Sequence, residues 1–455
     1  MSTARRAAAA LMVMGLLTAR PPVRLSAQAQ PQQRTKCLLV IENVDRQGVK
    51  EETAAGTNYY AGGNVRIRCG AARMASDSVA VLGGSVARFL GGVRYEDSTL
   101  AVTADTGTYY KDGERWEARG HVSARNTRTG SSLQGPSLDY LRPAAGVRDT
   151  LEMFAVGRPR IAYVPKDSAG TRDSAAANAA EPYIIVADRT RMRGEDQVWA
   201  GGRVTIDRSD FAARADSLRL DTGAGHDGTL LGKPVMKGLG SDTFDLSGTR
   251  IDLKLEGREL TLVTAKGKAR ALTAEWDLLA DTIAIDVNAK KAEQTLAWGH
   301  ADAHSSRYAV KADSLAIDTP AQHLTALRAF GHAWLGGQVD STTKDRDWLA
   351  GDTVRAAFVQ RDSAGKSRPA LASMEAHGHG RAFHRAPPKT GAGEPTLSYL
   401  RADAIVITMK PPAPDDSGDT VDRVDARGHV DGVQLEPKKA AATAATDRRP
   451  PEPAP

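Results

Sequence analysis

A glycine–aspartate spacing that recurs along this chain constrains its fold more than any other feature. In five places a Gly-x-Val/Ala turn is followed fourteen residues later by an aspartate with similar neighbours. The five pairs are Gly63 with Asp77, Gly91 with Asp105, Gly202 with Asp216, Gly267 with Asp281, and Gly299 with Asp313. Looser copies begin at Gly120, Gly331, Gly380 and Gly428, with related aspartates at Asp352 and Asp403. Such self-similarity indicates a stack of one small unit that cannot bury its apolar face alone.

The residues around each aspartate predict a β-strand that bends. Tyr308, Val310 and Ala312 alternate with other residues, which is the period of a half-buried strand. Leu315 and Ile317 alternate too, but the parity changes at the intervening Ala-Asp-Ser. We therefore expect a bulge or corner that keeps the apolar face inward, with the aspartate bonded to a nearby backbone N–H.

The glycine segments predict the turn from which each strand starts. Val65 and Ile67 share one face of the strand after Gly63, and Arg66 and Arg68 share the solvent face. Glycine suits this place because it adopts positive φ readily. Helical periodicity is almost absent, so we expect an all-β repeat array of antiparallel strands around one continuous interior. The 43 glycines and 22 prolines, with only 5% aromatic residues, fit many short strands joined by turns.

The N-terminus has the features of an export signal. Arg5 and Arg6 precede an apolar stretch over residues 7–18, and small residues follow near Ala27. We predict a signal peptide over residues 1–27, because the apolar run is too short to span a bilayer easily. Without those residues, which hold four arginines and no acid, the net charge falls from +6 to +2. That balance gives no reason to expect nucleic acid as a partner.

Composition along the chain divides it into blocks. We expect a first β block over residues 36–165, a flexible linker or insertion over residues 166–182, a second and more degenerate β block over residues 183–433, and a disordered tail over residues 434–455. The linker is rich in Ala, Ser and Asp, and the tail in Ala, Pro and Lys, without periodicity in either.

The two cysteines, Cys37 and Cys69, share the parity of inward-facing neighbours. In an exported protein we expect them to form a disulfide that ties the N-terminal strand to the array, which would add about 3–4 kcal/mol. The alternative is a pair of buried thiols.

Three segments carry a resemblance to a known family. They are Tyr60–Ile67 (YAGGNVRI), Phe89–Tyr95 (FLGGVRY) and Leu100–Asp105 (LAVTAD). Their strand–GNV–strand–AD pattern resembles the OstA/LptA family of periplasmic lipopolysaccharide-transport proteins. The resemblance is best in the first block. It implies an open β-jellyroll (β-taco), a V-shaped pair of sheets that shelters acyl chains and stacks end to end between the two membranes.

This resemblance also implies location and partners. We expect the periplasm or association with the outer membrane, and a lipopolysaccharide or other lipid as ligand. Other Lpt-type jellyroll proteins would bind by end-to-end strand addition, and self-association is expected by the same route. The chain is much longer than a lone bridge subunit, and it shows neither the long barrel region of the outer-membrane component nor the membrane helix of the inner-membrane one. The resemblance therefore implies the fold more strongly than a station on the transport route.

We predict that the inward-facing aliphatic residues line a lipid groove. Moving a twelve-carbon chain through water bare would cost on the order of 10 kcal/mol, at roughly 0.8 kcal/mol per methylene. The alternative is a closed core in which these residues pack against each other. The predicted lining residues are Val65, Ile67, Val79, Val81, Val93, Tyr95, Leu100, Val102, Leu218, Leu220, Ile283, Ile285, Leu315 and Ile317.

Catalytic and metal sites have weaker support in the sequence. Four histidines occupy the middle position of Gly-x-Val/Ala turns, so His377, His379 and His384 reflect the repeat more than a metal site. Each corner offers about one carboxylate, whereas calcium needs six to eight oxygens. We assign Glu96 and Asp97 to a solvated turn, because adjacent acids on a strand point to opposite faces. We therefore expect no enzyme, no cofactor and no metal.

Three functional hypotheses remain. The first is a lipid- or lipopolysaccharide-binding protein of outer-membrane assembly. The second is an exported structural or adhesive scaffold with a closed core and no ligand. The third, a carbohydrate-active β-helix enzyme, is weak because no acid pair recurs at one cleft.

Overall fold

The computed structural model describes residues 37–437, except residues 47, 55, 166–180, 240–242, 258, 274, 290, 338–345, 364–365, 387–393 and 412–419. The expected signal peptide, most of the expected linker and the tail beyond residue 437 lie outside the described residues. Within them, regular structure is β apart from two 3₁₀ turns, η1 (Lys111–Gly113) and η2 (Pro320–Gln322). The prediction of an all-β antiparallel fold is confirmed.

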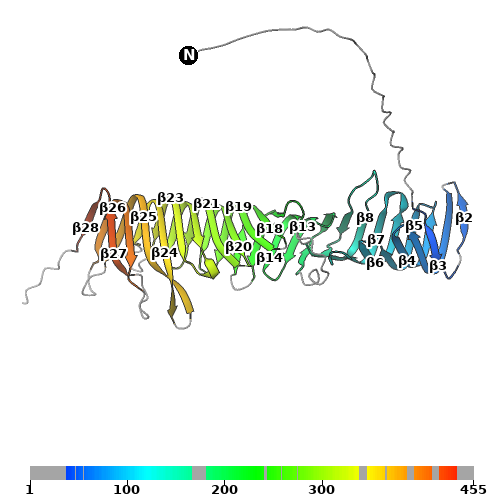
Figure 1. Ribbon diagram of the computed structural model, residues 1–455, viewed down its shortest axis with the longest axis horizontal. Coiled ribbons are helices and arrows are strands. Elements are labelled where there is room, and N and C mark those ends of the chain that lie inside the picture. The colour runs from blue at the N-terminus through cyan, green and yellow to red at the C-terminus, as the bar shows by residue number, and fades with distance from the viewer. Residues whose placement is uncertain are drawn as a thin grey trace, which may run out of the picture. The chain divides into compact units, whose positions relative to one another are not determined.

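The strands follow one another closely along the chain (Figure 1). They are β1 (Val40–Asn43), β2 (Lys50–Thr53), β3 (Gly56–Cys69), β4 (Ala72–Leu82), β5 (Val86–Glu96), β6 (Leu100–Tyr110), β7 (Arg115–Asn126), β8 (Ser132–Leu141), β9 (Glu152–Val156), β10 (Arg160–Tyr163), β11 (Tyr183–Val186), β12 (Arg189–Arg193), β13 (Gln197–Asp207), β14 (Phe211–Asp221), β15 (Asp227–Leu231), β16 (Val235–Gly238), β17 (Phe244–Ser247), β18 (Arg250–Glu256), β19 (Glu259–Thr273), β20 (Asp277–Asn288), β21 (Lys291–His304), β22 (Ala309–Asp318), β23 (Ala326–Gly336), β24 (Trp348–Ser363), β25 (Lys366–Ala386), β26 (Thr396–Met409), β27 (Val421–Arg427) and β28 (Asp431–Leu435).

Strand pairing is continuous from β1 to β28. Each long strand pairs antiparallel with the next, as in β3 with β4 and β21 with β22. In places two short strands replace one long one: β8 pairs with both β9 and β10, and β13 with both β11 and β12. We call each long strand, or each such pair, a rung. The pairing of β10 with β11 joins the two expected blocks.

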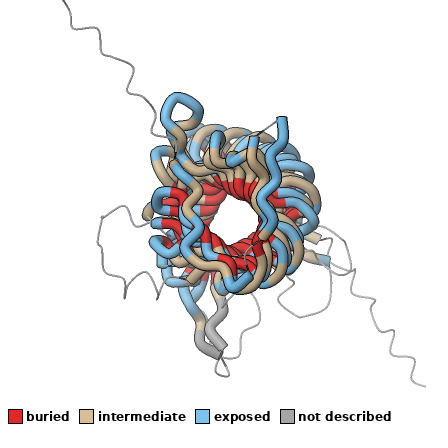
Figure 2. Tube along the Cα trace, turned by 90° about the vertical axis from the view of Figure 1, so that its right-hand side faces the viewer, coloured by how far each residue is buried: buried red, intermediate tan, exposed pale blue. Residues whose placement is uncertain are grey.

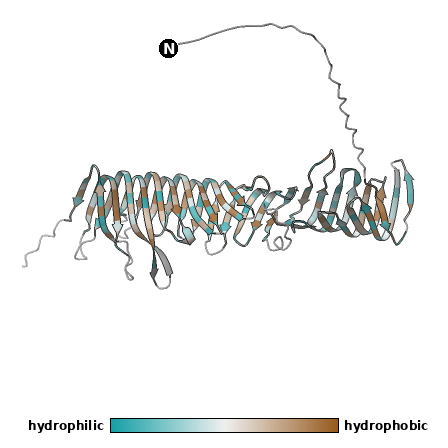
Figure 3. Cartoon of the chain, viewed as in Figure 1, coloured by the Kyte–Doolittle hydropathy of each residue, from teal (hydrophilic) through white to brown (hydrophobic). Residues whose placement is uncertain are grey.

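Each long rung bends near its middle. The register between β4 and β5 shifts between Ala75 and Ser78, which pair with Arg94 and Leu90. Buried residues change parity at the same place, because Ala72 and Met74 are buried before it and Val79 after it. The buried positions therefore stay on the inner side of the bend (Figure 2), and hydrophobic and hydrophilic residues alternate along the strands (Figure 3).

The recurring spacing of the repeat has a structural cause at these bends. Gly331 of β23 and the following His332 both have positive φ, 72° and 46°. The carboxylate of Asp313, on the neighbouring strand β22, packs against Gly331, and a Cβ atom there would collide with it. The aspartate thus completes the corner of the next rung. The same contact joins Asp77 to Gly91, Asp105 to Gly120, Asp188 to Gly202, Asp216 to Gly232, Asp281 to Gly299, Asp352 to Gly378 and Asp403 to Gly428.

Histidines in the corners contact these aspartates. Nδ1 of His332 lies 3.0 Å from Oδ2 of Asp313, and Nδ1 of His121 lies 2.7 Å from Oδ2 of Asp105. The corner histidines at 300, 379 and 429 are paired in the same way. They are exposed side chains on the outside of the bend.

The turns between rungs form two rows, one at each end of the bent strands. Row A comprises the turns at residues 70–71, 97–99, 127–131, 208–210 and 305–308, and row B those at 83–85, 111–114, 194–196, 222–226 and 319–325. The interior lies between the two halves of each rung, so rows A and B flank it on the side opposite the corners. Cys37 and Cys69 form a disulfide, with Cα atoms 5.3 Å apart, that attaches the residues before β1 to the end of β3.

Candidate functional site

The interior of the N-terminal rungs is filled by aromatic side chains. Trp116 of β7 is 1% exposed and stacks on Tyr95, with ring centroids 4.9 Å apart. Phe89 lies 5.6 Å from the same indole, and Tyr140 meets Tyr95 edge to face at 6.0 Å. These large rings occupy the space between the two halves of the rungs β5 to β8, which leaves the interior packed there.

A polar cluster joins the two rows over these rings. Asp97 in row A accepts hydrogen bonds from the hydroxyls of Tyr95 (2.9 Å) and Tyr140 (3.1 Å). Arg142, next to row B, lies 3.2 Å from the Asp97 carboxylate and 2.8 Å from that of Glu114. We call Asp97, Glu114 and Arg142 the cross-row clasp.

Burial shapes the chemistry of the clasp. The Asp97 side chain is 1% exposed, so the expectation of a solvated turn is wrong for this residue. It is buried because Arg142 and Tyr140 reach it from the row B side and Tyr95 from its own strand, and their guanidinium and hydroxyl groups replace water. Burial, followed by the charge of Asp97, raises the pKa of the Tyr95 and Tyr140 hydroxyls, which therefore act as hydrogen-bond donors to the carboxylate.

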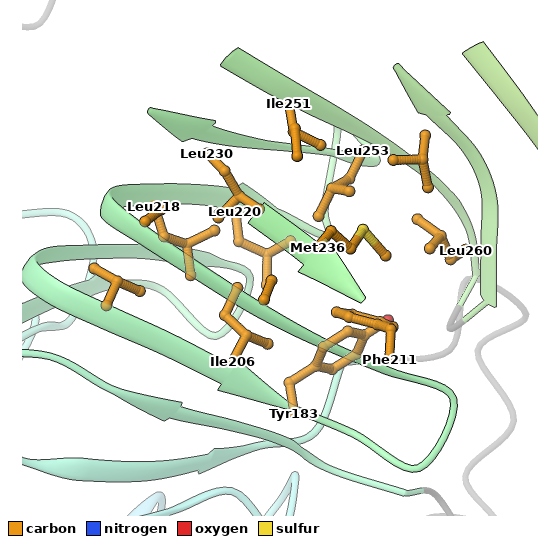
Figure 4. Close-up of a cluster of buried hydrophobic side chains, with 14 of the residues drawn as sticks. Tyr183, Ile206, Phe211, Leu218, Leu220, Leu230, Met236, Ile251, Leu253 and Leu260 are labelled. Atoms are coloured by element: carbon orange, nitrogen blue, oxygen red, sulfur yellow. The ribbon is translucent and has the colours of Figure 1, made fainter. Parts of the chain in front are cut away.

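The middle rungs are also joined across the rows. The Tyr163 hydroxyl lies 2.5 Å from the Thr222 hydroxyl and 3.1 Å from the Glu195 carbonyl oxygen. The Asn126 amide donates to the Glu195 carboxylate at 3.2 Å. Beneath these contacts, side chains from β11 to β19 converge in a packed cluster that includes Tyr183, Phe211, Leu220, Met236 and Leu253 (Figure 4).

All fourteen residues predicted to line a groove are buried members of this continuous core, between 0% and 8% exposed. The structure brings them together along the interior. Leu100 touches a gap of about 20 Å³, and Leu218 lines a separate hollow of about 630 Å³ with Phe154, Trp199 and Arg189. None lines the larger cavity described next.

The C-terminal rungs enclose a cavity of about 680 Å³. Its walls come from the strands β23 to β28 and from Arg307 and Tyr308 in the turn before β22. Trp348, Phe383 and Tyr399 contribute aromatic faces, with the Trp348 ring 6.2 Å from each of the other two. A volume of this size, lined mainly by apolar groups with a few polar ones, is typical of small-molecule sites. The remaining apolar walls are formed by Leu335, Leu371, Met374, Ala382, Leu400, Ile407, Met409, Val421, Val424 and Val433.

Polar groups gather on the row A side of this cavity. Asp347 lies 2.7 Å from Nδ1 of His384 and accepts hydrogen bonds from the backbone N–H and Nε of Arg385, at 3.1 and 3.2 Å. Burial alone would raise the pKa of the Asp347 carboxyl, but His384 and Arg385 outweigh it and hold that pKa below its usual value. Arg307 lies over the Tyr308 ring, 5.5 Å from its centroid.

The two ends of the cavity differ. On the N-terminal side Tyr308 packs edge to face on Phe358, with ring centroids 5.9 Å apart, and both side chains are buried. On the C-terminal side lie β27 and β28, where Val424, Val433 and Leu435 are 47%, 58% and 60% exposed. The cavity is therefore bounded by packed rings at one end and by exposed apolar side chains at the other.

The cavity residues were missed by the sequence reasoning. Trp348, Phe383 and Tyr399 stand on three consecutive rungs, and their aromatic character was the available signal. Trp348 and Phe383 are 35 positions apart and Phe383 and Tyr399 are 16 positions apart, so the register that aligns them is not apparent from spacing alone.

Other kinds of site lack support in the described chain. Among its residues no group of three or more His, Cys, Asp or Glu is arranged to hold a metal ion. His377, His379 and His384 contact different acids, Glu375, Asp352 and Asp347. No helix within the described residues has the length and apolar character needed to cross a membrane.

A comparison with solved structures finds a likeness for part of this chain. It is to LptH from Pseudomonas aeruginosa, described as the LptA homologous periplasmic component of the conserved lipopolysaccharide transport device. The match has 19% sequence identity and a TM-score of 0.23, and it covers 31% of this chain and 96% of LptH. No family model matches the sequence. No curated protein matches it either. The likeness to this periplasmic component is thus weak and confined to part of the chain.

Proposed function

We propose that this protein is a non-catalytic periplasmic lipid- or lipopolysaccharide-binding protein of the OstA/LptA type, which shelters acyl chains during outer-membrane assembly. The observation that carries the proposal is the cavity of about 680 Å³ in the C-terminal rungs, whose walls are mostly apolar. An acyl chain placed there leaves water at a gain of roughly 0.8 kcal/mol per methylene. The open β-jellyroll and the groove lined by the fourteen predicted residues belong to the same proposal. In this structure those fourteen residues are packed together in the core that continues from the cavity.

Partners follow from the two ends of the array. The rungs β1/β2 and β27/β28 each pair on one side only among the described strands. Unpaired strand edges accept further strands, and the exposed Val433 and Leu435 would add apolar contact. We propose other jellyroll proteins of the Lpt type, or a second copy of this chain, as end-to-end partners.

The test is photo-crosslinking from the interior in intact cells. A crosslinking amino acid is placed at Leu371 or Ile407 in the cavity, and at Val93 or Leu315 in the packed core as matched controls. We expect lipid adducts at the first two positions, identified by mass spectrometry after purification of the protein, and far fewer at the controls. Absence of lipid adducts at all four positions would refute lipid binding.

A closed structural scaffold without a ligand is the second candidate. The aromatic filling and the cross-row clasp of the N-terminal rungs favour it, because they leave no space for a chain there. It predicts that the Leu371 and Ile407 positions crosslink only to protein.

A further inference from the structure

The outer face of the middle rungs contains a hollow that lies outside the interior. Its volume is about 630 Å³, and its lining comes from β9, β12, β13, β14, β15 and β18. The same strands turn Leu220, Leu230 and Leu253 to the packed core on their other face (Figure 4). Every lining residue belongs to the described part of the chain. The hollow is therefore a separate candidate site that the lipid cavity does not use.

Strand register explains why the surface is hollow here. Gly201 of β13 pairs with Arg189 of β12 on one side and with Ser217 of β14 on the other. Ser217 pairs in turn with Leu231 of β15. The two central residues have no side chain or a short one, whereas Arg189 and Leu231 on either side are long and exposed. Gly201 and Ser217 therefore form a low floor between two higher walls.

A fixed aromatic pair stands beside this floor. Trp199, two residues before Gly201 on β13, pairs with Arg191 of β12, and Arg191 pairs with Phe154 of β9. The Arg191 guanidinium lies against both rings, 5.4 Å from each centroid. Glu152 holds the same guanidinium at 3.2 Å. The rings are therefore ordered before a ligand arrives.

Two of the cations around the hollow are already paired. The lining contains four arginines and no acidic residue. Arg191 is paired with Glu152, and Arg250 donates from Nε to Asp252 at 2.6 Å. The carboxylate of Asp216 lies outside the lining, in a corner. An anionic ligand would therefore be bound by the other two arginines.

The first of these, Arg189, projects over the floor. A Cβ atom at Gly201 would lie 3.3 Å from its Nε atom, so the guanidinium covers that glycine. The adjacent acid, Asp188, is bound by Arg203 at 2.7 Å and by Arg158 at 3.4 Å. No hydrogen bond or ion pair joins Arg189 to another residue in the described part of the chain. Its N–H donors can therefore bind an anion.

The second, Arg219, borders the floor from the opposite side. It pairs with Trp199 and lies two residues after Ser217 on β14. Its ion-pair partners, Asp221 and Asp227, each lie 3.7 Å from a guanidinium nitrogen, which is beyond hydrogen-bond distance. An anion above the floor can therefore accept hydrogen bonds from Arg219 as well.

Aromatic and cationic groups in one hollow match an anionic sugar. A sugar ring has C–H faces that pack on an aromatic ring, and guanidinium groups bind carboxylates and phosphates through charge-assisted hydrogen bonds. A peptide strand has no edge to join here, because each strand of the lining is paired on both sides. A bare acyl chain would leave the arginines without a partner.

We propose that this hollow binds an anionic saccharide, with a sugar ring against Trp199 and its carboxylate or phosphate group at Arg189 and Arg219. The site lies on the outer face, so it goes beyond the proposed lipid binding and does not depend on it.

The test is isothermal titration calorimetry with the purified full chain and four probes. Tetragalacturonate is a saccharide with carboxylates, phosphorylated mannopentaose is one with a phosphate, maltotetraose is neutral, and tetraglutamate carries carboxylates without a sugar. The variants are Arg189→Gln, Trp199→Ala and Ser217→Tyr, the last of which fills the floor without removing an arginine or a ring. Their matched controls are Arg214→Gln and Trp298→Ala, at exposed positions outside the lining.

We expect at least one of the two anionic saccharides to bind about ten-fold more tightly than maltotetraose and tetraglutamate, and their ranking identifies the preferred anion. Arg189→Gln should weaken that binding about ten-fold, the size of one charge-assisted hydrogen bond. Trp199→Ala should weaken it about five-fold through the loss of stacking. Ser217→Tyr should abolish it, and the two controls should leave it unchanged.

Each contrary outcome removes a defined part of the inference. Equal affinity for anionic and neutral saccharides, unchanged by Arg189→Gln, overturns the anionic group. Tetraglutamate binding as tight as that of the saccharides, unchanged by Trp199→Ala, overturns the sugar. Failure of all four probes to bind, or binding that Ser217→Tyr leaves intact, overturns the site, provided that the circular dichroism spectrum of a β protein is retained. The hollow and the lipid cavity share no residue, so none of these results changes the crosslinking expected at Leu371 and Ile407.

Discussion

The N-terminal rungs β3 to β8 and the C-terminal rungs β22 to β28 have the same type of glycine–aspartate corner but differ in what they enclose. Both carry the same contact, between Asp105 and Gly120 in the first region and between Asp313 and Gly331 in the second. The first interior is filled by Trp116, Tyr95 and their neighbours, and the second contains a cavity of about 680 Å³. The corner therefore sets the course of the backbone, and the inward side chains decide whether space remains.

The difference lies in side-chain volume and in closure across the rows. Phe89, Tyr95 and Trp116 are almost wholly buried inside the N-terminal rungs, whereas Trp348, Phe383 and Tyr399 are only half-buried and line the C-terminal cavity. The N-terminal rungs are also closed by Asp97 and Arg142, which join row A to row B. A repeat of this kind can thus combine a part with a filled interior and a part with a cavity in one continuous sheet.

Removal of an indole should distinguish the two regions most strongly. We expect Trp116→Ala to destabilise the N-terminal rungs by about 3–5 kcal/mol, because it empties a fully buried site. Trp348→Ala should cost about 1 kcal/mol, since its ring is only partly buried and stacks loosely in the cavity wall. Hydrogen exchange of the β5–β8 and β24–β26 amides measures each effect locally. Equal losses would mean that both interiors are packed alike.

The cross-row clasp should be the next largest contribution. In Arg142→Met the Asp97 carboxylate stays buried without its guanidinium partner, which should cost about 3 kcal/mol in the N-terminal rungs. The double variant Asp97→Asn with Arg142→Met should recover part of that loss, because no uncompensated charge remains. Chemical denaturation of the four proteins completes the cycle. Additive losses would show that Asp97 and Arg142 do not act as a pair.

The shared corner predicts equal effects in the two regions. Gly120→Ala and Gly331→Ala should each cost about 1–2 kcal/mol, since both glycines have positive φ, 73° and 72°, and both lie against an aspartate. Gly113→Ala is the control, because nothing lies near the added atom. Thermal unfolding of the variants tests this. A clearly larger loss at one corner would contradict the view that the two regions share the same backbone device.

The smallest expected effect is a pH dependence confined to the C-terminal rungs. The pKa of Asp347 is lowered in the folded chain, so its ionised form stabilises those rungs above its unfolded pKa of about 3.9. That contribution should disappear as the pH falls through the lower folded pKa. Hydrogen exchange of β24 and β25 between about pH 5 and pH 2 measures it, and Asp347→Asn should flatten the curve. An unchanged slope in the variant would assign the effect to other groups.

The bend of each strand could be predicted because the alternation of apolar residues changes parity within a few neighbouring positions. Phe211, Ala213 and Ala215, followed by Leu218 and Leu220, show the change of parity, and the structure buries all five. The partner of each aspartate could not be predicted in the same way. Spacing associates Asp77 with Gly63 within one unit, whereas the contact is with Gly91 on the next strand. This contact is decided by the strand register, which depends on the residues of both paired strands.

The cavity and the cross-row clasp could not be predicted from the sequence for a related reason. Asp97 is next to Glu96 in a polar turn, and nothing local indicates that Arg142 folds over it from the opposite row. The volume between rungs depends on side chains from many strands at once, so alternation identifies which residues face inward but not whether they fill the space.

The division of each corner between two strands has an evolutionary consequence. The aspartate of one strand packs against the glycine turn of the next. A duplicated segment therefore carries both an aspartate for the strand that follows it and a glycine turn for the strand that precedes it. Connections of very different length separate the two partners, as between Asp77 and Gly91 and between Asp352 and Gly378. Such a protein can gain or lose segments by recombination while every remaining junction stays intact, so its length can change without a new fold.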